Sequence, residues 1–187
     1  PLVGTGVRAI YTGIDASESA VIASQGTLDL AISGEGWFCV ESGGKKEYTR
    51  DGNFSISLSG SNAYLVNKNG DFVLDSTGKQ ITAAVDSKTN SIDTEAMLDK
   101  VGVYTFSNPE ALTPASSNSY LSNNYTGTAT AAKTGDYTVL KGYLEQSGVS
   151  LTDEMVALIT AQRGYQLSAR VVQTADEVEQ TSNSLRG

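Results

Sequence analysis

Hydrophobic and polar residues alternate through most of the chain with the period of two that β-strands require. The clearest case is the segment in which Phe54, Ile56 and Leu58 are separated by single serines, the pattern of a strand with one buried face. Turn residues recur about every eight to twelve residues, which is typical of an antiparallel all-β unit. Further strands are predicted over 7–11, 28–32, 37–40, 47–50, 63–66, 72–74, 80–82, 100–106 and 137–140.

One stretch interrupts this pattern. Residues 108–135 are rich in Ser, Thr, Asn and Ala, and they include Pro109 and Pro114. Residues of this kind favour turns and loops over regular strands. We therefore expect a surface loop with an irregular edge here.

From Glu145 the period changes to about three and a half residues, which indicates a helix. Ser150 can cap it, and Asp153 and Glu154 fall in the first turn, where negative charge complements the helix dipole. The apolar stripe has 4-3 spacing and then shifts by one residue, through Leu151, Met155, Leu158, Gln162, Tyr165, Ala169 and Val172, then Val171, Ala175, Val178, Ser182 and Leu185. The predicted fold is thus mainly β, an antiparallel all-β domain, plus one long C-terminal α-helix of about 52 Å.

The long helix needs a partner, because a compact β unit of this size cannot cover it from end to end. The partner is either a segment upstream of Pro1, which we expect because the chain does not begin with Met, or another subunit. The polar Gln162 lies on the apolar stripe. We expect Gln162 and the neighbouring Arg163 to set the register of helix packing.

Composition excludes many enzymatic chemistries. The 187 residues hold 13 Lys and Arg against 21 Asp and Glu, a formal charge of −8, with no His and a single cysteine, Cys39. Without His, the commonest general base and metal ligand is missing, and Ser–His and Cys–His pairs are impossible. A single cysteine also excludes an intramolecular disulfide and a multi-cysteine zinc site. We therefore expect no enzyme, no catalytic residue, no cofactor and no metal.

Two classes of partner are also disfavoured by the sequence. An acidic chain repels the phosphate backbone, so we expect no nucleic acid. Apolar runs stay well short of the roughly 20 residues that span a bilayer, so we expect no membrane insertion.

Several short motifs have both a chemical and a structural interpretation. The segments 51–53 and 67–71 could be calcium loops, but turn chemistry explains both, and the second lacks the EF-hand arrangement. Residues 34–36 precede a strand rather than a helix, which argues against a phosphate loop. Arg50 and Asp51 could form an ion pair or an inter-subunit contact. Of Trp37 and Phe38, we expect one in the core and the other as an interface anchor.

Four stretches carry a resemblance to a known family. They are GTGVR (4–8), TLDLAISGEGWF (27–38), YTRDGNF (48–54), and a C-terminal region made of GYLEQSGV (142–149), EMV (154–156), AQRGY (161–165) and QTADE (173–177). In this order they resemble the axial proteins of the bacterial flagellum, the rod and hook family, over nearly the whole chain. Within the family, GTGVR and AQRGY resemble distal rod members, which we favour. Trp37 and the ADEVEQ stretch (175–180) resemble proximal ones.

The resemblance implies an N-terminal and a C-terminal helix paired in a coiled coil that lines an axial tube, with an all-β domain outside. It divides the chain into a linker or extended segment (1–26), an all-β rod/hook-type domain (27–144) and an amphipathic helix for axial coiled-coil packing (145–187). The implied β-domain signature is Leu28, Asp29, Gly34, Gly36, Trp37, Phe38, Tyr48, Thr49, Arg50, Asp51 and Gly52. The implied assembly helix uses Leu151, Met155, Leu158, Gln162, Arg163, Tyr165, Ala169 and Val172.

The function implied is that of a structural subunit of the flagellar basal-body rod. Such a subunit serves motility, self-assembles with copies of itself and with other rod and hook proteins, and forms a hollow shaft that transmits torque to the hook. The flagellar type III export apparatus would carry it across the cytoplasmic membrane into the cell envelope. The alternative is a secreted surface or carbohydrate-binding module whose helix docks on the β unit. A stripe that persists for about ten turns favours assembly.

Overall fold

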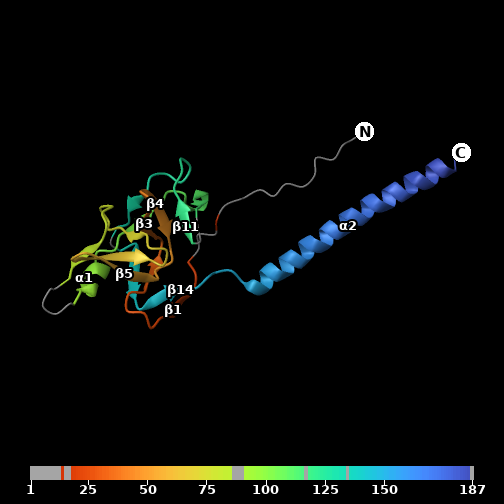
Figure 1. Ribbon diagram of the computed structural model, residues 1–187. Helices are drawn as coiled ribbons and strands as arrows, with labels where there is room; N and C mark the ends of the chain where they lie inside the picture. The colour runs from red at the N-terminus through yellow and green to blue at the C-terminus, as the bar shows by residue number, and fades with distance from the viewer. Residues whose placement is uncertain (1–13, 15–17, 86–90, 116–117, 134, 186–187) are drawn as a thin grey trace. The chain divides into compact units, whose positions relative to one another are not determined.

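The computed structural model describes residue 14 and residues 18–85, 91–115, 118–133 and 135–185. The chain divides into two compact units, Pro1–Ser147 and Gly148–Gly187. The first is built mostly of antiparallel strands, and the second holds the long helix coloured blue in Figure 1. The predicted fold class, mainly β with one long C-terminal helix, is confirmed. The strand predicted over 7–11 lies outside the described residues.

Every pairing between the described strands is antiparallel. The strands are β1 (Val21–Ala23), β2 (Leu30–Gly34), β3 (Trp37–Ser42), β4 (Lys45–Thr49), β5 (Phe54–Ser59), β6 (Asn62–Asn67), β7 (Phe72–Val73), β8 (Thr82–Ala84), β9 (Val103–Thr105), β10 (Thr113–Pro114), β11 (Ser119–Leu121), β12 (Thr130–Ala131), β13 (Tyr137–Lys141) and β14 (Tyr143–Glu145).

The largest sheet follows the order β10-β11-β4-β3-β7-β6-β5. In addition β9 pairs with β3 and β12, and β8 pairs with β6. Two smaller pairings join segments that are far apart in sequence, β2 with β13 and β1 with β14. The β1–β14 ribbon therefore brings the segment before the β domain beside the segment that leads to the long helix (Figure 1).

Both faces of β3 are buried, because its alternate residues enter two apolar clusters. Phe38 and Val40 belong to the larger cluster, while Trp37 and Cys39 belong to the smaller one. We expected one of Trp37 and Phe38 to be an exposed interface anchor. The structure buries both, with Trp37 5% exposed and Phe38 fully covered. The smaller cluster covers the face on which Trp37 lies, packing Tyr120 edge-on against its ring.

The stretch 108–135 is more ordered than its composition predicted. It holds a 3-10 helix, η1 (Pro109–Ala111), and the strands β10, β11 and β12. Asn123 organises this region by donating from Nδ2 to the carbonyl of Ala111 at 2.6 Å, and by accepting from the backbone N–H of Tyr125 at 2.8 Å. The expected irregular loop is therefore corrected: side-chain hydrogen bonds and pairing with β4 and β9 order the segment.

A short helix that the sequence pattern did not predict, α1 (Thr94–Leu98), is capped by the Asp93 carboxylate, which accepts from the backbone N–H of Ala96 at 3.0 Å. Met97 and Leu98 of this helix are buried in the larger cluster. Five residues are too few for a helical period to be visible in the sequence.

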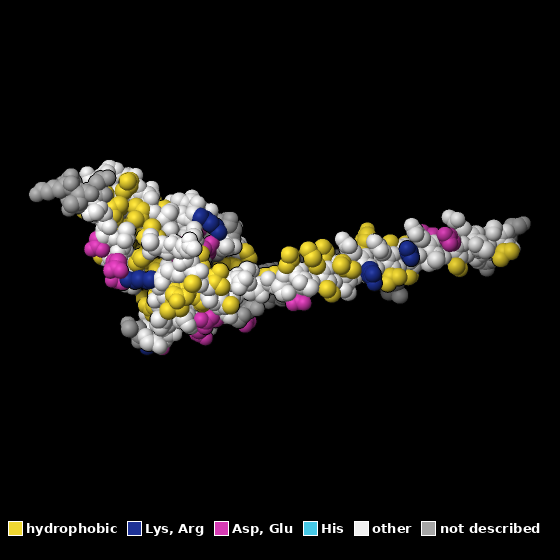
Figure 2. Space-filling model, turned by 90° about the horizontal axis from the view of Figure 1, so that it is seen from below, with side chains coloured by type: hydrophobic (Ala, Val, Ile, Leu, Met, Phe, Trp, Pro, Cys, Tyr) yellow, Lys and Arg dark blue, Asp and Glu magenta, His cyan; other side chains and the backbone are white. Residues whose placement is uncertain are grey.

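The long helix α2 spans Leu151–Ser184. The predicted cap at Ser150 is confirmed, because its side chain accepts from the backbone N–H of Asp153 at 3.4 Å. Its described residues are all exposed, and hydrophobic side chains lie along it in Figure 2. No helix in the described part of the chain combines the length and apolar character needed to cross a membrane.

Candidate functional site

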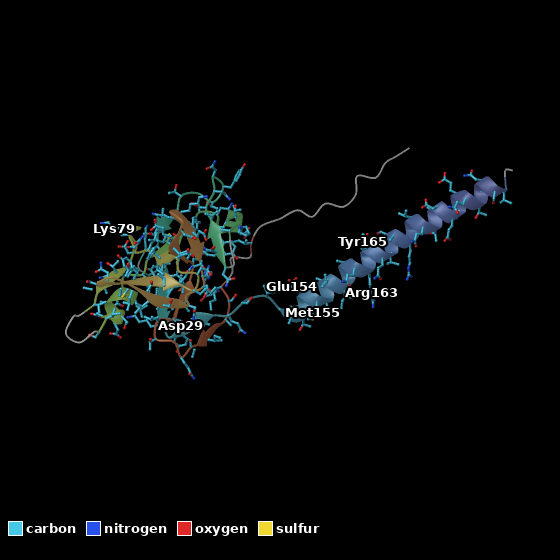
Figure 3. All side chains as sticks on the ribbon, in the orientation of Figure 1. Asp29, Lys79, Glu154, Met155, Arg163 and Tyr165 are labelled. Atoms are coloured by element: carbon cyan, nitrogen blue, oxygen red, sulfur yellow. The ribbon has the colours of Figure 1, made fainter. Side chains whose placement is uncertain are left out.

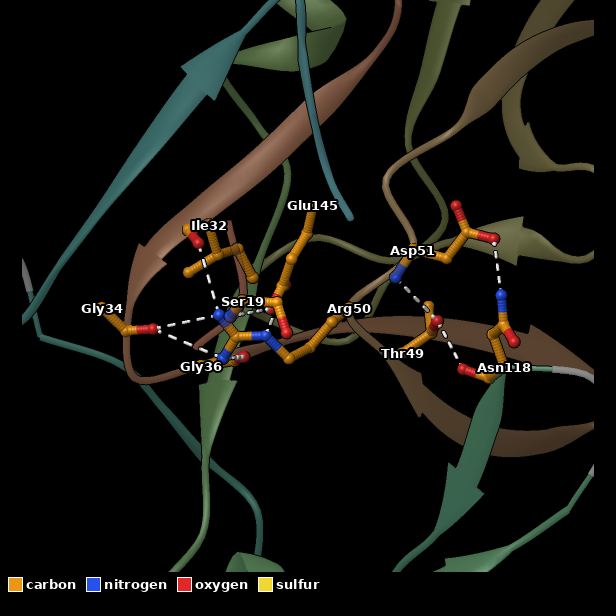
Figure 4. A network of polar contacts seen from close by, with 9 residues as sticks. All are labelled: Ser19, Ile32, Gly34, Gly36, Thr49, Arg50, Asp51, Asn118 and Glu145. Carbon is orange, nitrogen blue, oxygen red and sulfur yellow. Dashed lines mark hydrogen bonds and ion pairs between the residues drawn. The ribbon is translucent and has the colours of Figure 1, made fainter. Parts of the chain in front are cut away.

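Arg50, directly after β4, gathers three carbonyl groups and a carboxylate around its guanidinium group (Figure 4). Nε donates to Glu145 Oε2 at 2.6 Å, and the two Nη atoms donate to the carbonyl oxygens of Ile32, Gly34 and Gly36 at 3.2–3.4 Å. The side chains of Arg50 and Glu145 are only 13% and 8% exposed. This is a largely buried ion pair whose cation also satisfies backbone acceptors.

The turn between β2 and β3 is shaped to present these carbonyl groups. Gly34 has φ +102°, and a Cβ there would lie 2.8 Å from the carbonyl oxygen of Asp136. A larger residue would therefore be strained in this turn and would also clash with the strand beside it. The ring of Trp37, which follows the turn, has its centroid 6.0 Å from the Arg50 guanidinium carbon. The glycines and the aromatic residue of the signature thus shape the cradle for Arg50.

Glu145 extends the same network to the segment that enters the β domain. Its Oε1 accepts from the backbone N–H of Ser19 at 2.9 Å. Val21 of β1 is paired with Glu145 of β14, and the N–H of Gln146 donates to the carbonyl of Ala20 at 2.8 Å. The Arg50–Glu145 pair therefore fastens both connecting segments to the signature hairpin.

Asp51 does not pair with its neighbour Arg50. Its Oδ2 accepts from Lys68 Nζ at 2.7 Å. The same oxygen accepts from Asn118 Nδ2 at 3.3 Å, and the Asp51 N–H donates to Thr49 Oγ1 at 3.0 Å (Figure 4). Burial opposes ionisation of Asp51. The hydrogen bonds from Lys68, the Asn53 backbone and Asn118 outweigh it and lower the pKa of the carboxyl group. The hydrogen bonds of Asp51 thus stabilise the turn after β4.

Gly52 has a role that differs from the one its turn motif indicates. Turn chemistry explains the sequence of 51–53, and an Asp-Gly turn commonly uses a positive φ at glycine, but the φ of Gly52 is not positive. Instead a Cβ on Gly52 would lie 1.8 Å from the carbonyl oxygen of Leu30, and its own carbonyl accepts from the Leu30 N–H at 3.0 Å. Glycine is required by close backbone approach.

Asp29 is the buried polar member of the signature. It is 5% exposed and accepts hydrogen bonds from Ser24 Oγ and, at 3.0 Å, from Asn53 Nδ2. It thereby joins the segment that follows β1 to the turn after β4. Two other signature residues pack on different clusters: Leu28 is half-buried against the larger cluster, and Tyr48 lies in the smaller cluster, edge-on to Phe106 at 4.7 Å.

The residues predicted to form the assembly helix lie on α2. Because α2 is a regular helix, the position of each residue gives its angle around the helix axis. Leu151, Met155, Leu158, Gln162, Tyr165, Ala169 and Val172 share one face at about 100° per residue. Arg163 lies about 100° from Gln162. Leu151 is 69% and Tyr165 79% exposed, so this face is available to a partner.

The later apolar residues of α2 do not continue that face. Val171 and Val178 lie on the opposite side of the helix, together with Val156 and Leu167, which the stripe did not include. The sequence signal for this second face was present at four- and seven-residue spacings, but the first stripe obscured it. The helix thus presents apolar residues on two sides, as a helix with more than one partner does.

The described residues offer little to a small ligand or to covalent chemistry. One hollow of about 60 Å³ lies beside Glu35, Trp37, Arg50 and Phe106, and another of about 20 Å³ lies beside Asp51, Asn53 and Lys68. Ligand sites usually measure roughly 300–1,000 Å³. Burial raises the pKa of the Cys39 thiol to about 12, so the thiolate nucleophile is not formed at neutral pH. Among the described residues no cluster of three or more His, Cys, Asp or Glu could hold a metal.

Two family models match the chain. The model "Flagellar hook protein FlgE/F/G D1 domain" matches residues 31–98, and "Flagellar basal body rod FlgEFG protein C-terminal" matches residues 140–185. The first covers the Arg50 cradle, and the second covers Glu145 and all of α2.

Named relatives agree with these models. The flagellar basal-body rod protein FlgG of Bacillus subtilis is 34% identical over 183 residues, covering 91% of this chain and 69% of that protein. FlgG of Caulobacter vibrioides is 32% identical over 202 residues, covering 99% and 77%. The flagellar hook-basal body complex protein FlhP of Bacillus subtilis is 28% identical over 191 residues, covering 90% and 71%.

Proposed function

This chain belongs to the family of flagellar basal-body rod proteins and is a structural subunit of the rod, and we propose that it polymerises through α2 into a hollow shaft that transmits torque to the hook. The family resemblance found in the sequence is confirmed. The relatives named FlgG agree with the distal rod subgroup that the sequence favoured over the proximal one. Its place is the flagellar basal body, where it assembles with other flagellar proteins.

The observation that supports polymerisation is the exposure of the apolar side chains of α2. A helix of 34 residues exposes large apolar side chains along its length, including Leu151, Met155, Leu158, Val171 and Val178. At roughly 25 cal/mol per Å² of apolar surface, leaving these side chains in water forgoes a large stabilisation. Burial against helices of other copies would recover it.

The β domain contributes rigidity in this proposal. The Arg50–Glu145 pair and the β1–β14 ribbon fix the two segments that connect the domain to what precedes and follows it. Torque passing from the helices to the β domains would act on these segments. The division into a linker (1–26), a β domain (27–144) and an assembly helix (145–187) is part of the same proposal.

We further propose that the chain is not an enzyme and that its copies contact one another directly as a homopolymer. It would leave the cytoplasm through the flagellar export apparatus. The small hollows beside Trp37 and Asp51 give no support to the alternative of a secreted carbohydrate-binding module.

Sedimentation velocity over a concentration series tests polymerisation. The complete encoded protein is compared with a version that ends at Ser147 and therefore lacks α2. We expect long particles, visible as tubes by electron microscopy, for the complete protein alone, while the shortened version stays monomeric with unchanged β-sheet circular dichroism. A complete protein that remains monomeric at every concentration would contradict the proposal.

A further inference from the structure

Charged side chains on α2 are spaced so that acids and bases do not meet within the helix. Its described bases are Arg163 and Arg170, and residues three and four positions away from either of them are uncharged. The ion pairs found among the described residues all lie outside α2. A solvated helix gains roughly 0.2–0.5 kcal/mol from each opposite-charge pair at such spacings, and α2 uses none of them.

The same charges separate by sign around the helix axis. Glu154 and Arg163 are nine residues apart, as are Arg170 and Glu179, and nine residues are about two and a half turns. Glu154 and Glu179 therefore each lie on the side opposite a base, whereas Glu177 lies close to Arg170 around the axis. Arg163 and Arg170 are seven residues apart and share one flank, the basic flank, while Glu154 and Glu179 share the other, the acidic flank. Glu154 and Arg163 are labelled in Figure 3.

We propose that the basic flank of α2 in one copy contacts the acidic flank of α2 in a second copy. This inference rests on the proposed polymerisation and adds which surfaces meet. Complementary charge on opposite sides of one element suits a heterologous contact, because each copy then offers a different surface to each neighbour. Such contacts close into rings or continue as helical filaments.

Charge also sets the direction and the offset of this contact. In an antiparallel contact with full overlap, Arg163 and Arg170 would fall level with residues 172 and 165 of the second copy, so neither base would lie beside an acid of the facing acidic flank. A parallel pair in register would bring Glu179 beside Glu177 of the next copy, because Glu177 lies on the basic flank. A parallel contact offset by nine residues, about 14 Å along the axis, places a base opposite an acid.

Charge reversal in the complete protein tests the contact. One variant carries Arg163→Glu and Arg170→Glu, so that both flanks are acidic, and a second carries Glu154→Arg and Glu179→Arg, so that both are basic. Each variant alone should polymerise with a critical concentration raised at least about tenfold at low salt. An equimolar mixture should return to within about twofold of the unmodified protein, because the two kinds of flank alternate.

The control is a variant with Asp153→Arg and Glu110→Arg, two acids that lie outside both flanks, the second of them exposed in η1 of the β unit. It changes net charge as much as the second variant, but it leaves both flanks unaltered, so its assembly should be unchanged. Rescue in the mixture also shows that both reversed chains fold. If the unmodified protein polymerises and each reversed variant does so equally well alone, the flank contact is overturned while polymerisation stands. An unmodified protein that never polymerises overturns both.

Discussion

Arg50 shows how a single residue can hold several segments together. Replacing it with Met keeps much of its length but leaves the Glu145 carboxylate, 8% exposed, without its cation. Breaking such a pair from one side typically costs about 3–5 kcal/mol, because a buried charge is left uncompensated. We expect Arg50→Met to lower the free energy of unfolding of the β unit by about that amount in urea titrations.

The matched control for Arg50 is Lys141, whose Nζ lies 2.7 Å from Asp99 with side-chain exposures of 42% and 67%. Exposed pairs of this kind contribute little, because water and salt screen the two charges and holding two long side chains together costs entropy. Lys141→Met should therefore change stability little. Equal losses from the two substitutions would show that the buried network around Arg50 is not special.

Cys39 and two tyrosines predict how stability changes at alkaline pH. Burial raises the pKa of Cys39, Tyr48 and Tyr104 each to about 12, whereas in an unfolded chain the thiol ionises near 9 and the phenols near 10. The folded state keeps these protons longer, so stability must fall as pH rises from about 9 to 12. Denaturant titrations across this range measure the slope, which Cys39→Ala should reduce. Thiol reagents should label native Cys39 only as fast as the β unit opens.

At the scale of elements, we expect the specificity of α2 packing to come from a polar residue on an apolar face. Gln162 lies among Leu158, Tyr165 and Ala169 on that face. We expect Gln162→Leu in the complete protein to strengthen association by about 1 kcal/mol or more while permitting off-register or non-specific aggregates. Electron microscopy and sedimentation measure the two effects. Thr152→Leu, about 80° from Gln162 around the helix, is the control, and ordered tubes from Gln162→Leu would count against a register role.

Elements with a long or strict period were predictable from the sequence, and those held by side-chain contacts were not. The alternation around Phe54 and Ile56 gave β5, and the change of period after Glu145 gave α2. The strands within 108–135 depend on hydrogen bonds from Asn123, which leave no periodic trace.

The same distinction applies to the candidate site. Its residues belong to motifs that the sequence showed separately, but the Arg50–Glu145 pair joins positions 95 residues apart. No local pattern links those two positions, so only the fold reveals that the motifs meet.

For the whole molecule, the two units combine opposite properties. The core of the first unit consists of two apolar clusters. Hydrogen bonds and ion pairs of Arg50, Asp29 and Asp51 join its segments around that core. The second exposes its apolar side chains and is expected to complete its packing only in the assembly. Stability measured on the isolated chain therefore reports the β unit, whereas that of the helix depends on concentration.

The β1–β14 ribbon has an evolutionary consequence. Because the chain enters and leaves the β domain through two strands that lie side by side, the domain is an insertion whose ends are already joined. Insertions with adjacent ends can be enlarged, reduced or exchanged without displacing the sequence on either side. In the filament that we propose, one domain replacement would therefore give a new outer surface, while the segments that build the axis would keep their geometry.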